Sequence, residues 1–294
     1  MDTYCNLVRS SIRVARAFAE SLYTGLSRST EQGLGLEYID FRDYVYGDDV
    51  RYVDWRLSAR SLTPDGDIRL IVKVFQAERM IDTMMVVDTT SSMGFGEKPW
   101  ILGFASTLLA SLADSLEDKL TLVIMAEDVK VLSPNKPREA AYILDNIACS
   151  QGFRGKASLL DVLPSIRRKM HRPVVVLTDY AHNFNEVAGF LKAMRAARNH
   201  VLYISIADLF ETKPPLSDAV ARLVGLEDGG EAVGKLRDIY TSIRRHIAAL
   251  NALVKTYTGN SIALIGKKSA MNQRHRLVSS YLAVRSGLRA LTRY

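Results

Sequence analysis

Residues 83–96 read TMMVVDTTSSMGFG, and this segment sets the fold class. A short apolar run, MMVV at 84–87, leads directly into Asp88 and then into four consecutive hydroxyl side chains. Such a run is typical of a strand that is buried on both faces of a parallel sheet. Similar runs recur at 121–126, 173–178, 201–207 and 261–266, with helical patterns between them. The alternation predicts a doubly wound, mostly parallel α/β sheet.

Different patterns flank this α/β region. Apolar residues recur at i+4 spacing from Val14 to Leu26, which predicts an N-terminal helix. Between residues 33 and 79, apolar and charged residues alternate with a period of two, which predicts a small antiparallel ribbon. We therefore expect three parts: a helix plus charged β ribbon at 1–80, the α/β domain at 81–266, and a basic helix packed on it at 267–294.

Composition narrows the class of protein. The chain has 294 residues and is 48% hydrophobic, which is enough for a buried core. No stretch has eighteen consecutive apolar residues, so we expect no transmembrane segment. The two cysteines, Cys5 and Cys149, are too few for a disulfide framework, and we expect a cytoplasmic location.

The net formal charge of +7 is unevenly distributed. Residues 239–294 contain ten Lys and Arg and no Asp or Glu, so residues 1–238 carry −3. A basic segment of this kind fits an acidic protein, a nucleic acid or an anionic membrane surface as a partner. The alternative, which we favour, is a solvated basic face on terminal helices.

Polar side chains follow two of the expected strands. Asp88 ends the first strand and Asp179 follows the third. Ligands of open α/β sheets bind at the carboxyl ends of the strands, and Mg²⁺ takes carboxylate and hydroxyl oxygens together with water. Thr90 and Ser92 alternate with Asp88, so their oxygens can point the same way in an extended loop. The competing interpretation is that the hydroxyl run caps the helix that begins near Pro99.

The pattern Asp88-x-Thr90-x-Ser92 resembles the D-x-S-x-S motif of von Willebrand factor A domains, and Asp179 matches a later aspartate of that family. The resemblance implies a metal-ion-dependent adhesion site that holds Mg²⁺, or else Mn²⁺ or Ca²⁺, and leaves a coordination position for a partner's carboxylate. The threonine expected between the two aspartates is replaced by Ala157, with Ser158 next to it. The implied ligands are Asp88, Thr90, Ser92, Asp179 and Ser158.

A longer segment, GLEYIDFRDYVYGDDVRYVDWRLSARS at 35–61, is similar to the family known as domain of unknown function 58. Members typically occur beside MoxR-type AAA+ ATPases, and many carry membrane helices. The resemblance implies an architecture and a class of partner, not a reaction. The acidic and basic residues of this segment suggest either catalysis or a structural ion-pair network with Trp55 packed inward, and we favour the network.

We expect a non-enzymatic protein-binding module, because the five histidines are scattered and no nucleophile lies in a recognisable motif. Its metal site would engage an acidic residue of a partner, as an adaptor in a MoxR-type AAA+ ATPase system. The alternative is a Mg²⁺-dependent nucleic-acid-binding or phosphoryl-transfer protein that uses the basic C-terminal region. A third interpretation makes that region a peripheral membrane contact.

Overall fold

The computed structural model describes residues 2–29, 38–62, 68–75, 80–166, 171–213, 220–226 and 229–291. Its contacts divide the chain into two compact units. Met1–Ala19 and Met80–Tyr294 form the larger unit, and Glu20–Arg79 form the smaller one. The division therefore falls within the first helix, whose beginning belongs with the α/β unit.

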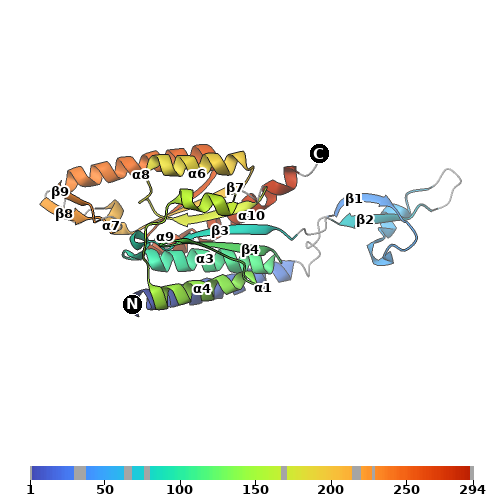
Figure 1. The fold of residues 1–294 in the computed structure, drawn as a ribbon. Coiled ribbons are helices and arrows are strands. Elements are labelled where there is room, and N and C mark those ends of the chain that lie inside the picture. Colours follow the sequence, from blue (N-terminus) through green and yellow to red (C-terminus); the bar gives the residue numbers. More distant parts are fainter. Residues whose placement is uncertain are drawn as a thin grey trace. The chain divides into compact units, whose positions relative to one another are not determined.

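The larger unit is built on a six-stranded sheet with the order β10-β7-β6-β3-β4-β5 (Figure 1). Five strands are parallel, and β5 pairs antiparallel with β4 at one edge, as the sequence AEDVKV suggests for a tight hairpin. This confirms the predicted doubly wound, mostly parallel sheet. The strands are β3 (Asp82–Asp88), β4 (Lys119–Met125), β5 (Val129–Leu132), β6 (Pro173–Thr178), β7 (His200–Ala207) and β10 (Asn260–Ile265).

Helices cover both faces of this sheet, which is why β3 and β6 are buried almost throughout. Figure 1 shows α6 and α8 on one face and α3 on the other, with α1 and α4 beyond α3. Apolar strand residues such as Met84 and Val176 pack against Phe190 of α6 and Leu250 of α8. The helices are α1 (Asp2–Ser29), α3 (Lys98–Ser115), α4 (Ala140–Asn146), α6 (Phe184–Ala196), α8 (Leu236–Thr258), α9 (Gly266–Asn272) and α10 (Arg274–Leu291).

Short elements complete this unit. Hairpin strands β8 (Val220–Val224) and β9 (Glu231–Lys235) precede α8, which begins at Leu236. The helical turns are η3 (Ser91–Gly94), η4 (Pro137–Glu139), η5 (Ile147–Gln151), η6 (Leu159–Val162), α5 (Leu163–Ile166) and α7 (Leu209–Thr212). Within the described ranges, no helix has the length and apolar character needed to cross a membrane.

The basic C-terminal segment forms two helices, α9 and α10, instead of one. Leu277, Tyr281 and Val284 of α10 are fully buried. Arg285 is also buried, at 5% exposure, and its guanidinium donates to both carboxylate oxygens of Asp118 at 2.7 and 3.0 Å. Part of the basic character of this segment therefore serves internal packing. The side chains of the residues after Gly287, including the expected Leu288 and Leu291, lie outside the described residues.

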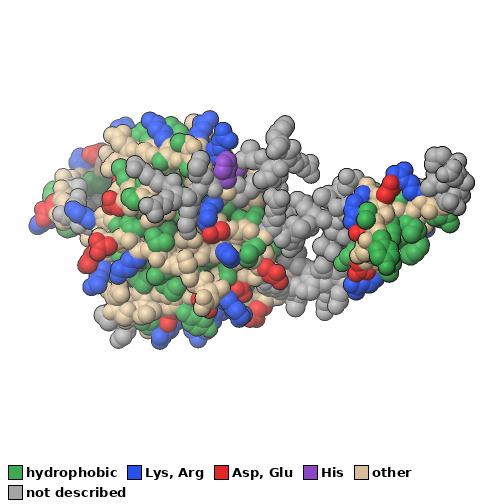
Figure 2. Space-filling model, turned by 45° about the vertical axis from the view of Figure 1, so that its right-hand side comes forward, with side chains coloured by type: hydrophobic (Ala, Val, Ile, Leu, Met, Phe, Trp, Pro, Cys, Tyr) green, Lys and Arg blue, Asp and Glu red, His purple; other side chains and the backbone are tan. Residues whose placement is uncertain are grey.

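The smaller unit pairs β1 (Tyr38–Asp43) antiparallel with β2 (Ile71–Phe75) and adds the short helical turns η2 (Val50–Tyr52) and α2 (Trp55–Ser58). Ion pairs join Arg42 to Asp48 and Arg69 to Asp43, which agrees with a structural role for the charged segment. Trp55, however, is 63% exposed, so the predicted inward packing is wrong. The Asp54 side chain caps α2, and Trp55 is the first residue of this helix. Figure 2 shows apolar side chains gathered on the surface of the smaller unit.

A disulfide joins Cys5 of α1 to Cys149 of η5, although two cysteines are too few to predict a disulfide framework from the sequence. The partners are 144 residues apart in sequence, so their spacing carries no signal of the pairing. The two cysteines meet because α1 lies near α4. An ion pair between Arg9 of α1 and Asp145 of α4 forms in the same region.

Candidate metal-binding site

The carboxyl ends of β3 and β6 are neighbours at the centre of the sheet. From β3 the chain proceeds toward one edge through β4 and β5, then returns to form β6 on the other side of β3. This reversal makes a topological switch point, where ligands of open α/β sheets bind. It brings Asp88, which ends β3, and Asp179, which follows β6, to the same part of the edge. Both carboxylates are buried, at 0% and 3% exposure.

The loop after β3 directs alternate hydroxyls toward Asp88. Thr90 donates its backbone N–H and its hydroxyl to Oδ1 of Asp88, at 2.9 and 2.6 Å. The Ser92 hydroxyl lies 3.3 Å from that of Thr90. Thr89 and Ser91 turn away and donate to the carbonyls of Met125 and Gly155. The predicted grouping of Asp88, Thr90 and Ser92 therefore exists in the structure.

Helix capping does not account for these hydroxyls. Thr90 occupies the N-cap of η3 without a side-chain capping bond. The N-cap of α3 is Glu97, also without one. The hydroxyls of Thr90 and Ser92 therefore face Asp88 and each other instead of the free N–H groups of a helix.

Lys98 places a positively charged ammonium group at this site. No sequence motif marks this lysine. Its Nζ lies 2.9 Å from Oδ2 of Asp179 and 2.6 Å from Oε1 of Glu211, and the side chain is only 1% exposed. Burial alone would lower the pKa of Lys98, but Asp179 and Glu211 outweigh burial and raise the pKa above its usual value. A charged ammonium therefore neutralises part of the acidic cluster.

His182 also contacts two carboxylates, those of Asp88 and Glu186. Its Nε2 lies 3.2 Å from Oδ2 of Asp88, and its Nδ1 lies 2.8 Å from Oε1 of Glu186. Burial opposes protonation, but the bonds to Asp88 and Glu186 raise the pKa of His182 to about 10. Burial likewise disfavours the charged form of Asp88, while bonds from His182, Thr178 and Thr90 lower its pKa. The imidazolium and the carboxylate thus form a buried ion pair at neutral pH.

The loop that would supply a further ligand lies against this site without contributing an oxygen. Ala157 is buried and donates its backbone N–H to the carbonyl of Ala126. The Ser158 hydroxyl donates to Oε1 of Glu186 at 2.8 Å and caps η6. Ser158 is therefore connected to Asp88 only through Glu186 and His182, whereas a direct ligand would have to face Asp88.

The donor set fits a small, hard divalent cation. Carboxylate and hydroxyl oxygens are the ligands that Mg²⁺ takes, and the cation commonly keeps several waters, which suits a site without an oxygen at Ala157. Acidic groups outnumber basic ones here, because two basic side chains contact four carboxylates, and this excess favours an added cation. These groups are Asp88, Asp179, Glu186, Glu211, Lys98 and His182.

A large groove opens beside these residues, with a volume of about 600 Å³. Ser92, Lys98 and Asp179 belong to its lining. Much of the remaining lining is apolar and includes Phe210 of α7, Val224 of β8 and Ile243 of α8. The arrangement combines a few charged groups with an apolar wall, which is the usual composition of a binding site.

The strand order and the acid–hydroxyl loop at the switch point define a doubly wound α/β protein with an adhesion-type motif. The chain belongs to the family described as "Protein of unknown function DUF58", whose model matches residues 40–265. Uncharacterised proteins of Mycobacterium tuberculosis and Mycobacterium bovis are each 29% identical to it over 204 residues. The match covers 64% of this chain and 60% of each relative, so the chain spans less than two thirds of their length.

Solved structures with a related fold share little sequence with this chain. BatB from Bacteroides thetaiotaomicron is 15% identical, with a TM-score of 0.43 and coverage of 69% of this chain and 99% of that chain. A von Willebrand factor type A protein from Catenulispora acidiphila is 10% identical, with a TM-score of 0.36 and coverage of 72% and 44%.

Proposed function

We propose that this protein is a non-enzymatic binding module that engages an acidic residue of a partner protein through a divalent cation. The observation that carries the proposal is the convergence of Asp88, Thr90 and Ser92 with the buried Asp179 at one switch point of the sheet. These four residues would hold Mg²⁺, or else Mn²⁺ or Ca²⁺. Ser158 would not bind the cation directly, because its hydroxyl donates to Glu186. The bound cation would attract a carboxylate that the acidic cluster alone repels.

The groove next to the site supports a protein as the partner. Its apolar wall, which includes Phe210 and Ile243, can take up the side chains that flank an acidic residue. We propose a MoxR-type AAA+ ATPase as this partner, on the strength of the family resemblance. In this proposal the chain acts as an adaptor in the cytoplasm.

The alternative of nucleic-acid binding has less support. Arg285 of the basic C-terminal segment is buried against Asp118, and Arg274 lies over the ring of Phe18, so part of the positive charge is used internally. A mobility shift with a steep salt dependence would favour this alternative.

The metal proposal predicts that Mg²⁺ binding depends on Asp88. In calorimetric titrations the wild type should bind Mg²⁺, and Asp88→Asn, which keeps the shape of the side chain, should lose at least about tenfold in affinity because a charged ligand is removed. Ser91→Ala is the matched control, because Ser91 lies in the same loop but turns away from Asp88. Equal affinities of wild type and Asp88→Asn would contradict the metal site.

The partner proposal is tested with a purified MoxR-type AAA+ ATPase from the same organism. Capture by the wild type should be lost with EDTA and restored by excess Mg²⁺, while Asp88→Asn should capture little under either condition. Undiminished capture in EDTA would contradict the metal bridge and leave the groove as the binding surface. Absence of capture under all conditions would contradict the choice of partner.

The cytoplasmic location is tested through Cys5 and Cys149, because disulfides rarely persist in a reducing compartment. If the compartment is reducing, alkylation at the moment of cell lysis should find both thiols free, with the Cys5–Cys149 bond of the structure forming only after the protein is exposed to air. A fully formed disulfide in cells would contradict this part of the proposal.

A further inference from the structure

The disulfide between Cys5 and Cys149 lies next to the two loops that shape the candidate metal site. One is the metal-site loop (residues 89–94), which carries Thr90 and Ser92. The other is the loop at 152–158, which follows directly after η5 and its Cys149. Cys5 belongs to the first turn of α1, and its neighbour Tyr4 contacts both loops. The bond therefore joins two segments that adjoin the metal site.

On one side of the bond, η5 continues into the loop at 152–158. Arg154 of this loop donates its backbone N–H to the carbonyl of Thr89 at 3.0 Å. The carbonyl of Gly155 accepts the backbone N–H of Ser91, also at 3.0 Å. Thr89 and Ser91 alternate with the proposed ligands, so these two hydrogen bonds help to hold the metal-site loop in position.

On the other side of the bond, the ring of Tyr4 packs against both loops. It lies edge to face on Phe153, with ring centroids 5.5 Å apart. A Cβ atom added to Gly94, the last residue of η3, would lie 3.2 Å from the hydroxyl oxygen of Tyr4 and 3.1 Å from Cβ of Phe153. Gly94 is buried, so Tyr4 and Phe153 together cover the end of the metal-site loop.

The first turn of α1 depends on the disulfide more than the rest of the helix does. Tyr4 and Cys5 are only partly buried, whereas Val8, Ile12 and Ala15 are buried. The N–H groups of a first helical turn have no partner within the helix, and chain ends open most easily. Loss of the bond should therefore release Tyr4 while packing keeps the remainder of the helix in place.

General stabilisation of the fold is the competing role for the bond, because a cross-link that closes a long loop restricts the whole unfolded chain. The two roles predict different effects of reduction. A general cross-link lowers the protection of backbone hydrogen bonds throughout the α/β unit. A link to the metal-site loop lowers it most at the hydrogen bonds of that loop.

We propose that Cys5 and Cys149 form a redox switch, in which the closed bond orders the metal-site loop and raises the Mg²⁺ affinity of the candidate metal site. The inference rests on the proposed function. The oxidant is a low-molecular-weight disulfide such as glutathione disulfide. One protein thiolate attacks it and releases one thiol, and the second protein thiol then displaces the other. One S–S bond forms in the protein, one breaks in the oxidant, and the two protein protons end on the two released thiols.

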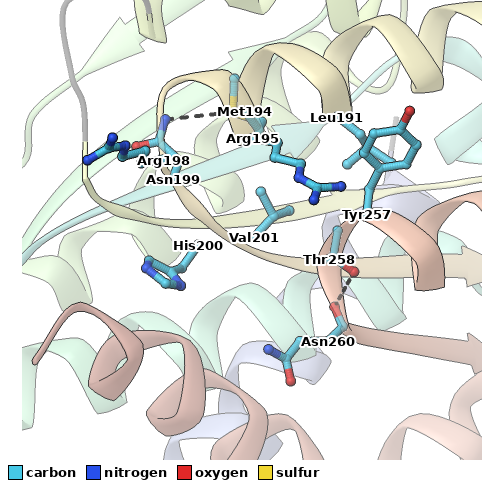
Figure 3. A pocket seen from close by; sticks show the side chains of 10 residues that line it. All are labelled: Leu191, Met194, Arg195, Arg198, Asn199, His200, Val201, Tyr257, Thr258 and Asn260. Carbon is cyan, nitrogen blue, oxygen red and sulfur yellow. Dashed lines mark hydrogen bonds between the residues drawn. The ribbon is translucent and has the colours of Figure 1, made fainter. Parts of the chain in front are cut away.

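Hydrogen exchange of the full chain without metal tests the order of the loop. The amides of Ser91 and Arg154 should exchange at least about tenfold faster in the reduced protein than in the oxidised protein. The amide of His200 is the reference, because it lies at the start of β7, at the other end of the sheet. The hollow beside it is lined by residues within 191–201 and 257–260, which belong to neither loop (Figure 3). Equal changes at all three amides would overturn the proposal, since reduction would then lower only the global stability.

Calorimetric titration with Mg²⁺ tests the link to the metal site. The oxidised protein should bind Mg²⁺ at least about fivefold more tightly than the reduced protein. By linkage, Mg²⁺ should make the disulfide harder to reduce by the same factor, measured as the oxidised fraction in glutathione buffers. Equal Mg²⁺ affinities of the two forms would overturn the switch and leave the metal site in place. Absence of Mg²⁺ binding by both forms would overturn the proposed function, whereas faster exchange of Ser91 in the reduced form would still support ordering of the loop by the bond.

Three variants identify the route between the bond and the loop. Cys5→Ser should match the reduced wild type with or without reductant, which separates the switch from any effect of the reductant on Mg²⁺. Tyr4→Ala keeps the disulfide but removes the ring, so its oxidised form should exchange at Ser91 nearly as fast as the reduced wild type. Asn6→Ala is the matched control, because Asn6 is exposed near the start of the same helix, and it should behave like the wild type. Slow exchange at Ser91 in oxidised Tyr4→Ala would overturn the link through Tyr4.

Discussion

At the scale of single residues, the candidate metal site contains its own positive charges. Lys98 and His182 each bridge two carboxylates, and both side chains are almost completely buried. A buried carboxylate without a compensating charge is strongly unfavourable. The two cations therefore offset the cost of burying the Asp88 and Asp179 side chains at the centre of the fold. They also compete with a metal for the same oxygens.

Replacing Lys98 with methionine tests this competition. Without Mg²⁺ we expect Lys98→Met to lower the free energy of unfolding by about 3 kcal/mol, because Asp179 and Glu211 lose their buried partner. In the variant, Mg²⁺ should bind at least about tenfold more tightly than in the wild type and should restore part of the lost stability. Urea unfolding with and without Mg²⁺ measures both effects.

Lys267→Met provides a control for Lys98→Met, because Lys267 is partly exposed and lies outside the acidic cluster at the switch point. Its effect on Mg²⁺ affinity should be small. If Lys98→Met binds Mg²⁺ no better than the wild type does, Lys98 and the cation do not share Asp179.

At the scale of elements, the site depends on two loops that lie against each other. The loop at 152–158 accepts a backbone hydrogen bond from Ser91 at the carbonyl of Gly155, and Arg154 donates to the carbonyl of Thr89. Gly155 has a φ of 89°, and a Cβ atom on it would lie 2.3 Å from the backbone nitrogen of Glu127. Backbone atoms cannot give way as a flexible side chain can, so only glycine fits here.

Gly155→Ala should therefore displace the loop that holds Ser91. We expect a loss of at least about 2 kcal/mol of stability, measured by urea unfolding, together with weaker Mg²⁺ binding. Gly259→Ala serves as the comparison, since Gly259 also has a positive φ but has no atom within 4 Å of an added Cβ. It should cost about 1 kcal/mol from the backbone alone. Similar losses of stability for the two variants would show that the clash between the added Cβ and the backbone of Glu127 does not matter at Gly155.

At the scale of the whole molecule, the disulfide ties the N-terminal helix to the α/β unit across 144 residues of sequence. A cross-link of this length greatly restricts the unfolded chain, although native-state effects modify the gain. The packing of α1 does not depend on the bond alone, because Val8, Ile12 and Ala15 are buried. The helix should therefore remain folded when the bond is reduced, while the chain as a whole becomes less stable.

Reduction with dithiothreitol should lower the free energy of unfolding of the wild type by about 2–4 kcal/mol. Cys5→Ser should reproduce this loss, and the reductant should have no further effect on that variant. Denaturant unfolding followed by circular dichroism provides the measurement. An unchanged midpoint on reduction would indicate that the bond contributes nothing to stability under these conditions.

The sequence by itself determined the doubly wound sheet and the position of Asp88 at a strand end, because buried parallel strands produce apolar runs and helices separate them. It also predicted that the hydroxyls of Thr90 and Ser92 lie near Asp88, although Ser91–Gly94 form a helical turn instead of the extended loop on which that prediction was based. Only the tertiary structure decided which charges surround Asp88 and Asp179. Lys98 and Glu211 are 113 residues apart, and Cys5 and Cys149 are farther apart still. Local patterns reflect the periods of helices and strands, whereas such pairs form when packing brings distant segments together, which no local spacing records.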